Sequence, residues 1–296
     1  MFDISGYYEA KQIDDVFDYI KKEPAARLIA GGTDVLIKAR EGKENYTEVP
    51  LIGINHIAEL HQIYLDDDQT LVIGALNTFT EVEKNPLVKK YLPMLSQAVS
   101  FVGGPQTRHV ATIGGNICNG ATSADSAPTL FAYNALLEIH SADGKKEVPI
   151  ADFYKGAGWV DLKAGEVLVN IKITKDNYKG FVGNYTKFAQ RNALDIANLS
   201  CACLFKVVNN QIADLRICFG VAAPTPIRMP QAEKYAQGKE LSSDLLKEIG
   251  QKCLADTNTR DSWRASKNFR DQLVTILPGR NITSALNSKK EGSLHE

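Results

Sequence analysis

The chain has 296 residues, which is enough for one large domain or two ordinary ones. Hydrophobic residues make up 44% and charged residues 23% of it, a composition typical of globular proteins, and the formal net charge of −1 gives no argument for binding nucleic acid or an anionic membrane. The first ten residues lack the pattern of a signal peptide, and no stretch approaches the ~20 apolar residues that span a bilayer. An odd count of five cysteines predicts reduced thiols, and we therefore expect a cytoplasmic protein.

The first part of the chain predicts alternating strands and helices. Apolar runs predict strands, the third of them a partly extended edge, at residues 26–30, 49–54, 58–65 and 71–76. Thr33 is expected to cap one helix, and another should begin at Thr78 or Thr80. Apolar spacing predicts a helix over 92–102, and Asp143-Gly144 between two alternating runs predicts a hairpin.

The pattern changes near residue 178, where we place a domain boundary. Three strand-like runs predict an antiparallel meander, with Asn209-Asn210 at one turn. Two helices should follow, over 242–256 with serine caps and over 265–280, and the tail from 287 to 296 is expected to fray.

The stretch Val110–Asp125, "VATIGGNICNGATSAD", contains three glycines and many small polar residues, so little of it should fill a core. Glycine lets the backbone approach a ligand closely, and consecutive N–H groups near a helix start attract anions. Either Gly31-Gly32 or Gly114-Gly115 alone would be read as a tight turn. Together, 83 positions apart and flanked by hydroxyl and amide side chains, they predict two loops that clasp a diphosphate-containing nucleotide.

Other motifs in the sequence give weaker indications of function. The sequence has no P-loop, no G-x-G-x-x-G and no H-E-x-x-H pattern, and His56 and His61 are interpreted as surface or loop residues. Cys201 and Cys203 share one strand face and are interpreted as small core residues. Cys118 is either small filler or a neighbour of the cofactor.

Three segments, "AGGTDVLI", "IGALNTFTEVE" and "GGPQTRHVATIGGNICNGATSADSAP", resemble the FAD-binding medium subunit of molybdenum hydroxylases, the xanthine dehydrogenase group that includes carbon monoxide and nicotinate dehydrogenases. The likeness runs along nearly the whole chain, and "GGNICNGATSADSAP" is most similar to the separate FAD subunit of bacterial xanthine dehydrogenases. It implies an α+β fold: a vanillyl-alcohol-oxidase-type (PCMH-type) FAD-binding domain over 1–177, then a smaller domain of antiparallel sheet and helices over 178–290, of the carbon monoxide dehydrogenase flavoprotein type.

The resemblance also implies which residues bind FAD. Two loops would wrap its diphosphate, with the residues Arg27, Leu28, Ile29, Ala30, Gly31, Gly32, Thr33 and Asp34 in one and Thr112, Ile113, Gly114, Gly115 and Asn116 in the other. Further contacts are implied for Asp125, Leu168 and Lys187, and apolar lining of the flavin for Val102 and Ile196. From the residues alone, Asp125 could instead cap a helix and Lys187 could be a solvated strand lysine. No catalytic or metal-binding residue is expected on this chain.

The implied function is electron transfer within a complex. FAD would sit on this chain, while a large subunit would hold the molybdenum cofactor and a small subunit the [2Fe–2S] clusters, in a dimer of heterotrimers. Xanthine or another purine is the leading substrate, with NAD⁺ or another acceptor, and "RNALDI" (191–196) departs from the charged loop of the vertebrate enzymes. Alternatives are a nicotinate-type hydroxylase subunit, a stand-alone flavin oxidoreductase and a module that has lost its cofactor.

Overall fold

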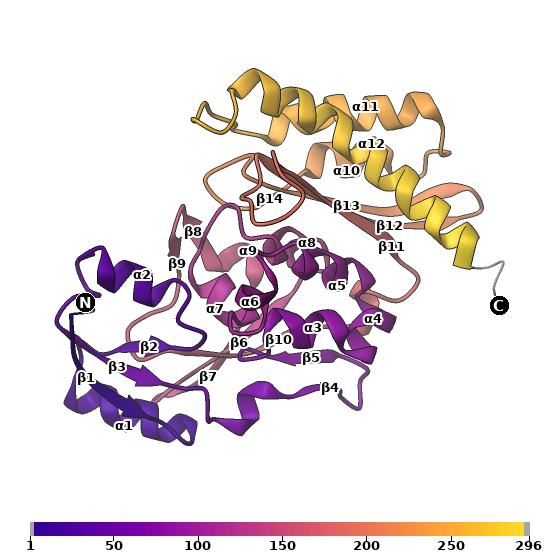
Figure 1. Cartoon of the computed structure of the whole chain (residues 1–296). Helices are drawn as coiled ribbons and strands as arrows, with labels where there is room; N and C mark the ends of the chain where they lie inside the picture. The colour runs from indigo at the N-terminus through magenta and orange to yellow at the C-terminus, as the bar shows by residue number, and fades with distance from the viewer. Residues whose placement is uncertain (1–2, 293–296) are drawn as a thin grey trace.

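The computed structural model describes the backbone of residues 3–292 and the side chains of residues 3–288. Two sheets and their helices form the N-terminal part, and a third sheet covered by long helices forms the C-terminal part (Figure 1). The fold is therefore α+β, as the sequence predicts. No helix in the described range is long and apolar enough to cross a membrane.

The first sheet has three parallel strands in the order β1-β3-β2. Its elements and the helices between them are β1 (Ile4–Glu9), α1 (Ile13–Lys22), β2 (Arg27–Ile29), α2 (Val35–Arg40) and β3 (Val49–Gly53). The strands expected at 26–30 and 49–54 are confirmed. The cap of α2 differs from the prediction, because Asp34 rather than Thr33 occupies the N-cap position and its side chain makes no capping bond.

The second sheet has five antiparallel strands in the order β4-β5-β10-β6-β7. They are β4 (Ile63–Leu65), β5 (Leu71–Gly74), β6 (Leu136–Ser141), β7 (Gly144–Pro149) and β10 (Val167–Ile173). The hairpin at Asp143-Gly144 is confirmed, whereas only the second half of 58–65 is a strand, since Ala58–His61 forms a 3-10 helix.

One face of this sheet carries a polar cluster around Glu138, which we call the Glu138 cluster. The Glu138 carboxylate accepts hydrogen bonds from Lys172 at 2.7 Å, Asn170 at 3.1 Å and His140 at 2.6 Å. Burial by itself would raise the pKa of Glu138, but these three hydrogen bonds outweigh it and lower the pKa to about 2.

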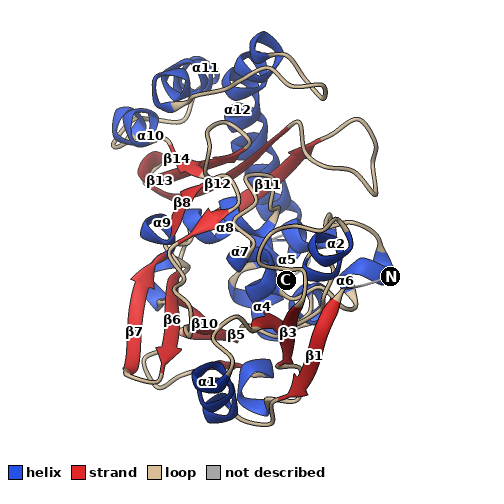
Figure 2. Ribbon diagram, turned by 90° about the vertical axis from the view of Figure 1, so that its left-hand side faces the viewer, coloured by secondary structure: helices blue, strands red, loops and turns tan. Residues whose placement is uncertain are grey.

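Short helices pack on the second sheet and carry the segments that form the site (Figure 2). They and a small ribbon are α3 (Phe79–Lys84), α4 (Pro86–Tyr91), α5 (Pro93–Ser100), α6 (Pro105–Arg108), α7 (Ile113–Cys118), α8 (Ser126–Ala132), α9 (Ile150–Phe153), β8 (Tyr154–Gly156) and β9 (Trp159–Val160). The helix over 92–102 is confirmed. Thr78 caps α3, because its hydroxyl accepts from the Glu81 backbone N–H.

The glycine-rich stretch is more buried than its composition suggests. It contains α7, whose Ile113 and Ile117 are fully buried in the main core, so the expectation that little of it fills a core was wrong. A Cβ atom on Gly114 would lie 2.6 Å from the Ala75 carbonyl oxygen. A side chain at position 114 would prevent the tight packing of α7 against Ala75, the residue that follows β5. This close packing lets both isoleucines reach the core.

The third sheet is the predicted antiparallel meander, in the order β11-β12-β13-β14. Its elements and helices are β11 (Val182–Phe188), β12 (Leu199–Val208), β13 (Gln211–Gly220), β14 (Ile227–Arg228), α10 (Pro230–Ala236), α11 (Ser243–Cys253) and α12 (Lys267–Gly292). Asn209 and Asn210 form the β12–β13 turn with φ of 50° and 63°. Ser242 caps α11, and Cys201 and Cys203 are fully buried, as predicted.

The last helix is longer than its sequence indicates. α12 continues through Pro278 to Gly292, so the fraying expected from residue 287 does not begin there, and residues 293–296 lie outside the described range. Ile282 and Ala285, beyond the proline, are buried in the second core. Their burial against the sheet outweighs the lost proline N–H, which is a tertiary effect that local propensity does not contain.

Two arginines of the third sheet donate hydrogen bonds to the C-terminal end of α8, the helix whose start lies at the candidate site. Arg216 donates to the Ala132 carbonyl at 3.3 Å, and Arg228 donates to the Phe131 carbonyl at 3.2 Å. Both acceptors lie at the C-terminal end of α8, where carbonyls lack helical partners. The start of α8, at Asp125, is therefore fixed relative to the third sheet.

Candidate cofactor-binding site

The two glycine segments, far apart in sequence, lie in direct contact. A Cβ atom on Gly31 would lie 1.9 Å from the Val110 carbonyl oxygen, so a residue with a side chain cannot stand there without separating the segments. Gly32 has φ of 70°, a left-handed conformation that favours glycine. The first pair of glycines thus allows the two segments to pack directly against each other.

A cavity of about 710 Å³ opens along this junction, within the usual size of ligand pockets. Nearly all residues expected in the two loops line it, together with two expected elsewhere: Arg27, Leu28, Ala30, Gly31, Gly32, Thr33, Asp34, Thr112, Gly114, Gly115, Asn116, Val102 and Leu168. Ile29 and Ile113 do not line it. Ile113 is instead fully buried on the core side of α7.

The backbone donors of the two segments differ. The hydrogen bonds of the described residues use none of the N–H groups of Gly31, Gly32, Thr33 and Asp34 as donors. In the second segment every N–H from residue 113 to 116 is already used, for example Gly114 to the Ala75 carbonyl at 2.9 Å. The backbone N–H groups that remain available to an anion therefore belong to the first segment. In the second segment, the glycines of α7 contribute backbone that no side chain covers.

Lys38 is a lining residue that the sequence analysis missed. Its ammonium lies 2.6 Å from an Asp34 carboxylate oxygen and donates to the Asn119 side-chain oxygen at 2.8 Å. The i, i+4 spacing of Asp34 and Lys38 on a helix was the available signal.

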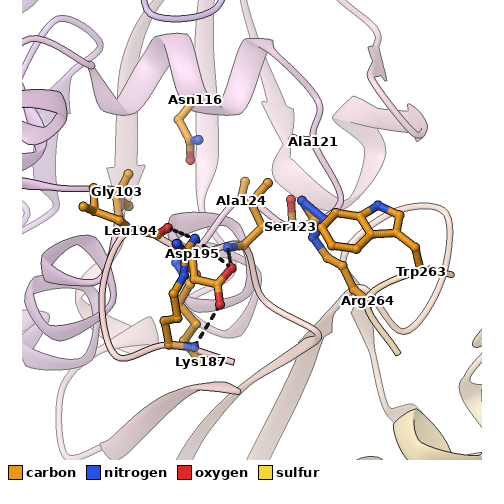
Figure 3. Close-up of a pocket in the computed structure, with 14 residues that line it drawn as sticks. Gly103, Asn116, Ala121, Ser123, Ala124, Lys187, Leu194, Asp195, Trp263 and Arg264 are labelled. Carbon is orange, nitrogen blue, oxygen red and sulfur yellow. Dashed lines mark hydrogen bonds and ion pairs between the residues drawn. The ribbon is translucent and has the colours of Figure 1, made fainter. Parts of the chain in front are cut away.

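A second, smaller cavity of about 420 Å³ adjoins the first, and Val102 and Asn116 line both. It is also lined by Asp125 and Lys187, implied above as FAD contacts, and by Ile196, implied as apolar lining of the flavin. The Asn116 side chain points into the space (Figure 3), and its oxygen accepts from the Ser126 hydroxyl at 2.7 Å, which leaves the amide N–H₂ for a ligand.

Lys187 and Asp125 form a buried ion pair in the wall of this cavity. The Lys187 ammonium lies 2.8 Å from one Asp125 oxygen, and the Tyr185 hydroxyl donates to the other at 2.7 Å. The Lys187 side chain is 8% exposed and that of Asp125 6%, so Lys187 is not a solvated lysine. Asp125 occupies the N-cap position of α8, as the alternative predicted, but its side chain makes no capping hydrogen bond and pairs with Lys187 instead. Burial raises the pKa of Asp125, and the Lys187 charge opposes that rise.

Four further lining residues come from loops without any periodic signal. Leu194, Asp195, Trp263 and Arg264 reach the smaller cavity from two loops of the C-terminal part, and no local pattern places them together. Cys118 lines the larger cavity, and burial raises the pKa of its thiol to about 12, so the thiol is neutral near pH 7.

Comparison with known families defines the class of protein. Residues 2–175 match the model described as the FAD binding domain in molybdopterin dehydrogenase, and residues 184–285 match the CO dehydrogenase flavoprotein C-terminal domain. The chain belongs to the family of FAD-binding medium subunits of molybdenum hydroxylases, so the resemblance stated from its motifs is confirmed.

The chain is also similar to individual proteins over most of its length. The putative xanthine dehydrogenase FAD-binding subunit of Escherichia coli (strain K12) is 41% identical over 286 residues, which cover 97% of each chain. The glyceraldehyde dehydrogenase medium chain of Sulfolobus acidocaldarius is 30% identical, over 92% of this chain and 95% of the relative. A carbon monoxide dehydrogenase chain from Hydrogenophaga pseudoflava shares the fold, with a TM-score of 0.90 at 24% identity over 97% of this chain and 99% of that one.

Proposed function

We propose that the chain binds FAD across both cavities and is the electron-transfer subunit of a xanthine or purine dehydrogenase. The observation that carries the site is the junction of Gly31 and Val110, where residues 31–34, whose N–H groups donate to no other described residue, line a cavity that adjoins a second one with a buried Lys187–Asp125 pair. The 41% identity with the Escherichia coli subunit supports the choice of substrate.

The residues present fit a diphosphate-containing cofactor. Gly115 lines the larger cavity, and a Cβ atom there would meet the Thr112 hydroxyl oxygen at 2.9 Å and no other heavy atom within 4 Å. We assign the diphosphate to the N–H groups of residues 31–34 and to this open backbone. Val102 and Ile196 would offer the flavin an apolar environment.

The Lys187–Asp125 pair holds a fixed charge arrangement at that end. Because both groups are buried and hydrogen-bonded, their positions are set before any ligand enters. The Asn116 amide adds an unused donor nearby. These groups orient a ligand, and no side chain need act as acid, base or nucleophile.

In this proposal FAD, held by the residues named above, would supply the redox chemistry that links [2Fe–2S] clusters of a small subunit to NAD⁺ or another acceptor. The molybdenum cofactor would lie on a large subunit, in a dimer of heterotrimers. All five cysteines are unpaired, in keeping with the expected cytoplasmic location.

The experiment is to purify the native complex and measure FAD, molybdenum and iron, then to compare xanthine with nicotinate as donors to NAD⁺. We expect a flavin spectrum, both metals and faster NADH formation with xanthine. A colourless preparation that takes up no FAD would refute the cofactor assignment, a chain that purifies alone would refute the complex, and a preference for nicotinate would refute the substrate.

Gly115→Val tests the diphosphate position. The added side chain would project into the larger cavity, so FAD retention should fall while the far-UV circular dichroism spectrum stays the same. Gly6→Val is the matched control, because a Cβ atom there meets only Pro50, at 3.8 Å, and the position lies on β1 away from both cavities. FAD content equal to wild type in Gly115→Val would show that the assigned segment is wrong.

A further inference from the structure

Two loops of the C-terminal part line the smaller cavity. The 189–198 loop joins β11 to β12, and the 257–266 loop precedes α12. Figure 3 shows Trp263 and Arg264 on one side of the cavity and Leu194, with Gly103, on the other.

The charges of this cavity do not cancel. Lys187 is paired with Asp125 at 2.8 Å, and Arg191 is paired with Asp195 at 3.6 Å. Arg264, the remaining charged lining residue, forms no ion pair with any carboxylate in the described part of the chain. The cavity therefore carries one uncompensated positive charge.

Arg264 is held in an orientation suited to an anion. Its guanidinium carbon lies 4.0 Å from the centre of the Trp263 ring, and that ring is 84% exposed. Stacking on an indole fixes the plane of the guanidinium and leaves its edge of N–H donors free. Such an edge binds planar or multi-oxygen anions by paired hydrogen bonds.

A buried arginine, Arg270, donates hydrogen bonds to both loops. Arg270 on α12 is 2% exposed, and its three nitrogens donate to the Asn198 carbonyl at 3.0 Å, to the Ser262 hydroxyl at 2.7 Å and to the Arg260 carbonyl. These acceptors lie on both loops, and the Gln190 amide also donates to the Arg264 carbonyl at 3.3 Å. A buried cation is costly unless it is fully hydrogen-bonded, so this geometry is strongly specified.

We propose that Arg264 is the residue by which the smaller cavity selects an anionic electron acceptor, and that Arg270 is the positioning residue that fixes the two loops around it. The inference rests on the proposed function, because it requires flavin at this cavity. The acceptor class is a small molecule with phosphate or similar anionic groups, which the uncompensated charge attracts and the guanidinium edge binds.

Arg264→Gln in the native complex tests the selectivity. With donor saturating, we compare NAD⁺ and ferricyanide, which are anionic, with 1,4-benzoquinone, which is neutral. KM for both anionic acceptors should rise about tenfold, equivalent to about 1.4 kcal/mol, with kcat nearly constant and the quinone unaffected. Arg260→Gln is the control, because it removes the same charge from an exposed side chain of the same loop that lines neither cavity.

The acceptor pattern separates recognition from general damage. An equal change for charged and neutral acceptors, or the same change in Arg260→Gln, would overturn the role of Arg264. If the wild-type complex holds FAD and these outcomes are found, this inference alone fails. If the wild-type complex holds no FAD, the proposed function fails and this inference with it.

Arg270→Lys tests the positioning role without removing the charge. Lysine cannot reach three acceptors with a planar fork, so backbone hydrogen exchange should accelerate in both loops while α11 stays protected. KM for NAD⁺ should also rise in Arg270→Lys while reduction of 1,4-benzoquinone stays unchanged. Unchanged exchange, acceleration in one loop only, or an equal change for both acceptors would refute the positioning role.

Discussion

The buried Lys187–Asp125 pair allows the sharpest test of the site's electrostatics. At 2.8 Å and an effective dielectric constant of about 20, the gross attraction is roughly 6 kcal/mol. Much of this is offset by desolvation, but removal of one partner leaves a buried charge, which costs about 3–5 kcal/mol. We therefore expect Lys187→Met to lower the free energy of unfolding by about that amount at neutral pH.

The loss should depend on pH with a defined sign. Burial already raises the pKa of Asp125, and loss of the Lys187 charge removes an influence that lowers it, so the pKa rises further. A carboxyl whose folded pKa exceeds its unfolded value destabilises the fold increasingly as pH rises between the two values. The deficit of Lys187→Met should be small near the acid end of this window and largest above it.

The assay is urea unfolding of the purified protein at about pH 5 and about pH 8, with the midpoint and slope fitted together. Asp125→Asn combined with Lys187→Met should recover most of the loss, because Tyr185 can still donate to the amide oxygen. Lys89→Met, at an exposed lysine, is the control and should change stability by less than about 0.5 kcal/mol. The reasoning is refuted if Lys187→Met loses no more stability than Lys89→Met, or if its loss does not grow with pH.

Three further predictions concern packing, acid stability and thiol reactivity. Gly31→Ala should lower both stability and FAD content, because the new Cβ atom would overlap the Val110 carbonyl; Gly279→Ala, where the Cβ atom would only touch Leu246 at 3.6 Å, should not, and equal thermal midpoints would contradict this. Glu138→Gln should be less stable than wild type at neutral pH, and the difference in urea midpoint should vanish as pH falls from the unfolded pKa of 4.5 toward the folded value of about 2; a difference that persists at the acid end would be contrary evidence. Cys118 should react slowly with iodoacetamide near pH 8, because desolvation raises the pKa of its thiol to about 12, and alkylation as fast as that of a free thiol would count against this shift.

Local patterns predicted the elements that have local causes. The Asn209-Asn210 turn, the Ser242 cap and the hairpin at Asp143-Gly144 all follow from short-range chemistry, and each is present. Errors occur where packing overrides such chemistry. The helix beyond Pro278 persists because its later residues are buried, and Ile113 fills the core because Gly114 allows α7 to approach β5's continuation.

The candidate site shows the same division. Most of the residues supplied by the glycine motifs and the family resemblance line one of the two cavities, including Asp125 and Lys187. The pairing of these two, by contrast, brings together positions 62 residues apart on different sheets and helices. Neither local spacing nor charge pattern indicates which lysine meets which carboxylate.

The sequence by itself determined many strands and turns and the two glycine segments, because turn chemistry, apolar periodicity and close backbone approach are encoded over a few residues. Its motifs also resemble a known family, and that resemblance implied the α+β class. Only the tertiary structure decided that the free N–H donors belong to residues 31–34, that Lys187 and Asp125 form a buried pair, and that Arg264 remains unpaired above Trp263. Hydrogen-bond satisfaction and net local charge are properties of neighbours in space. They become defined when distant loops meet, as they do around Arg270.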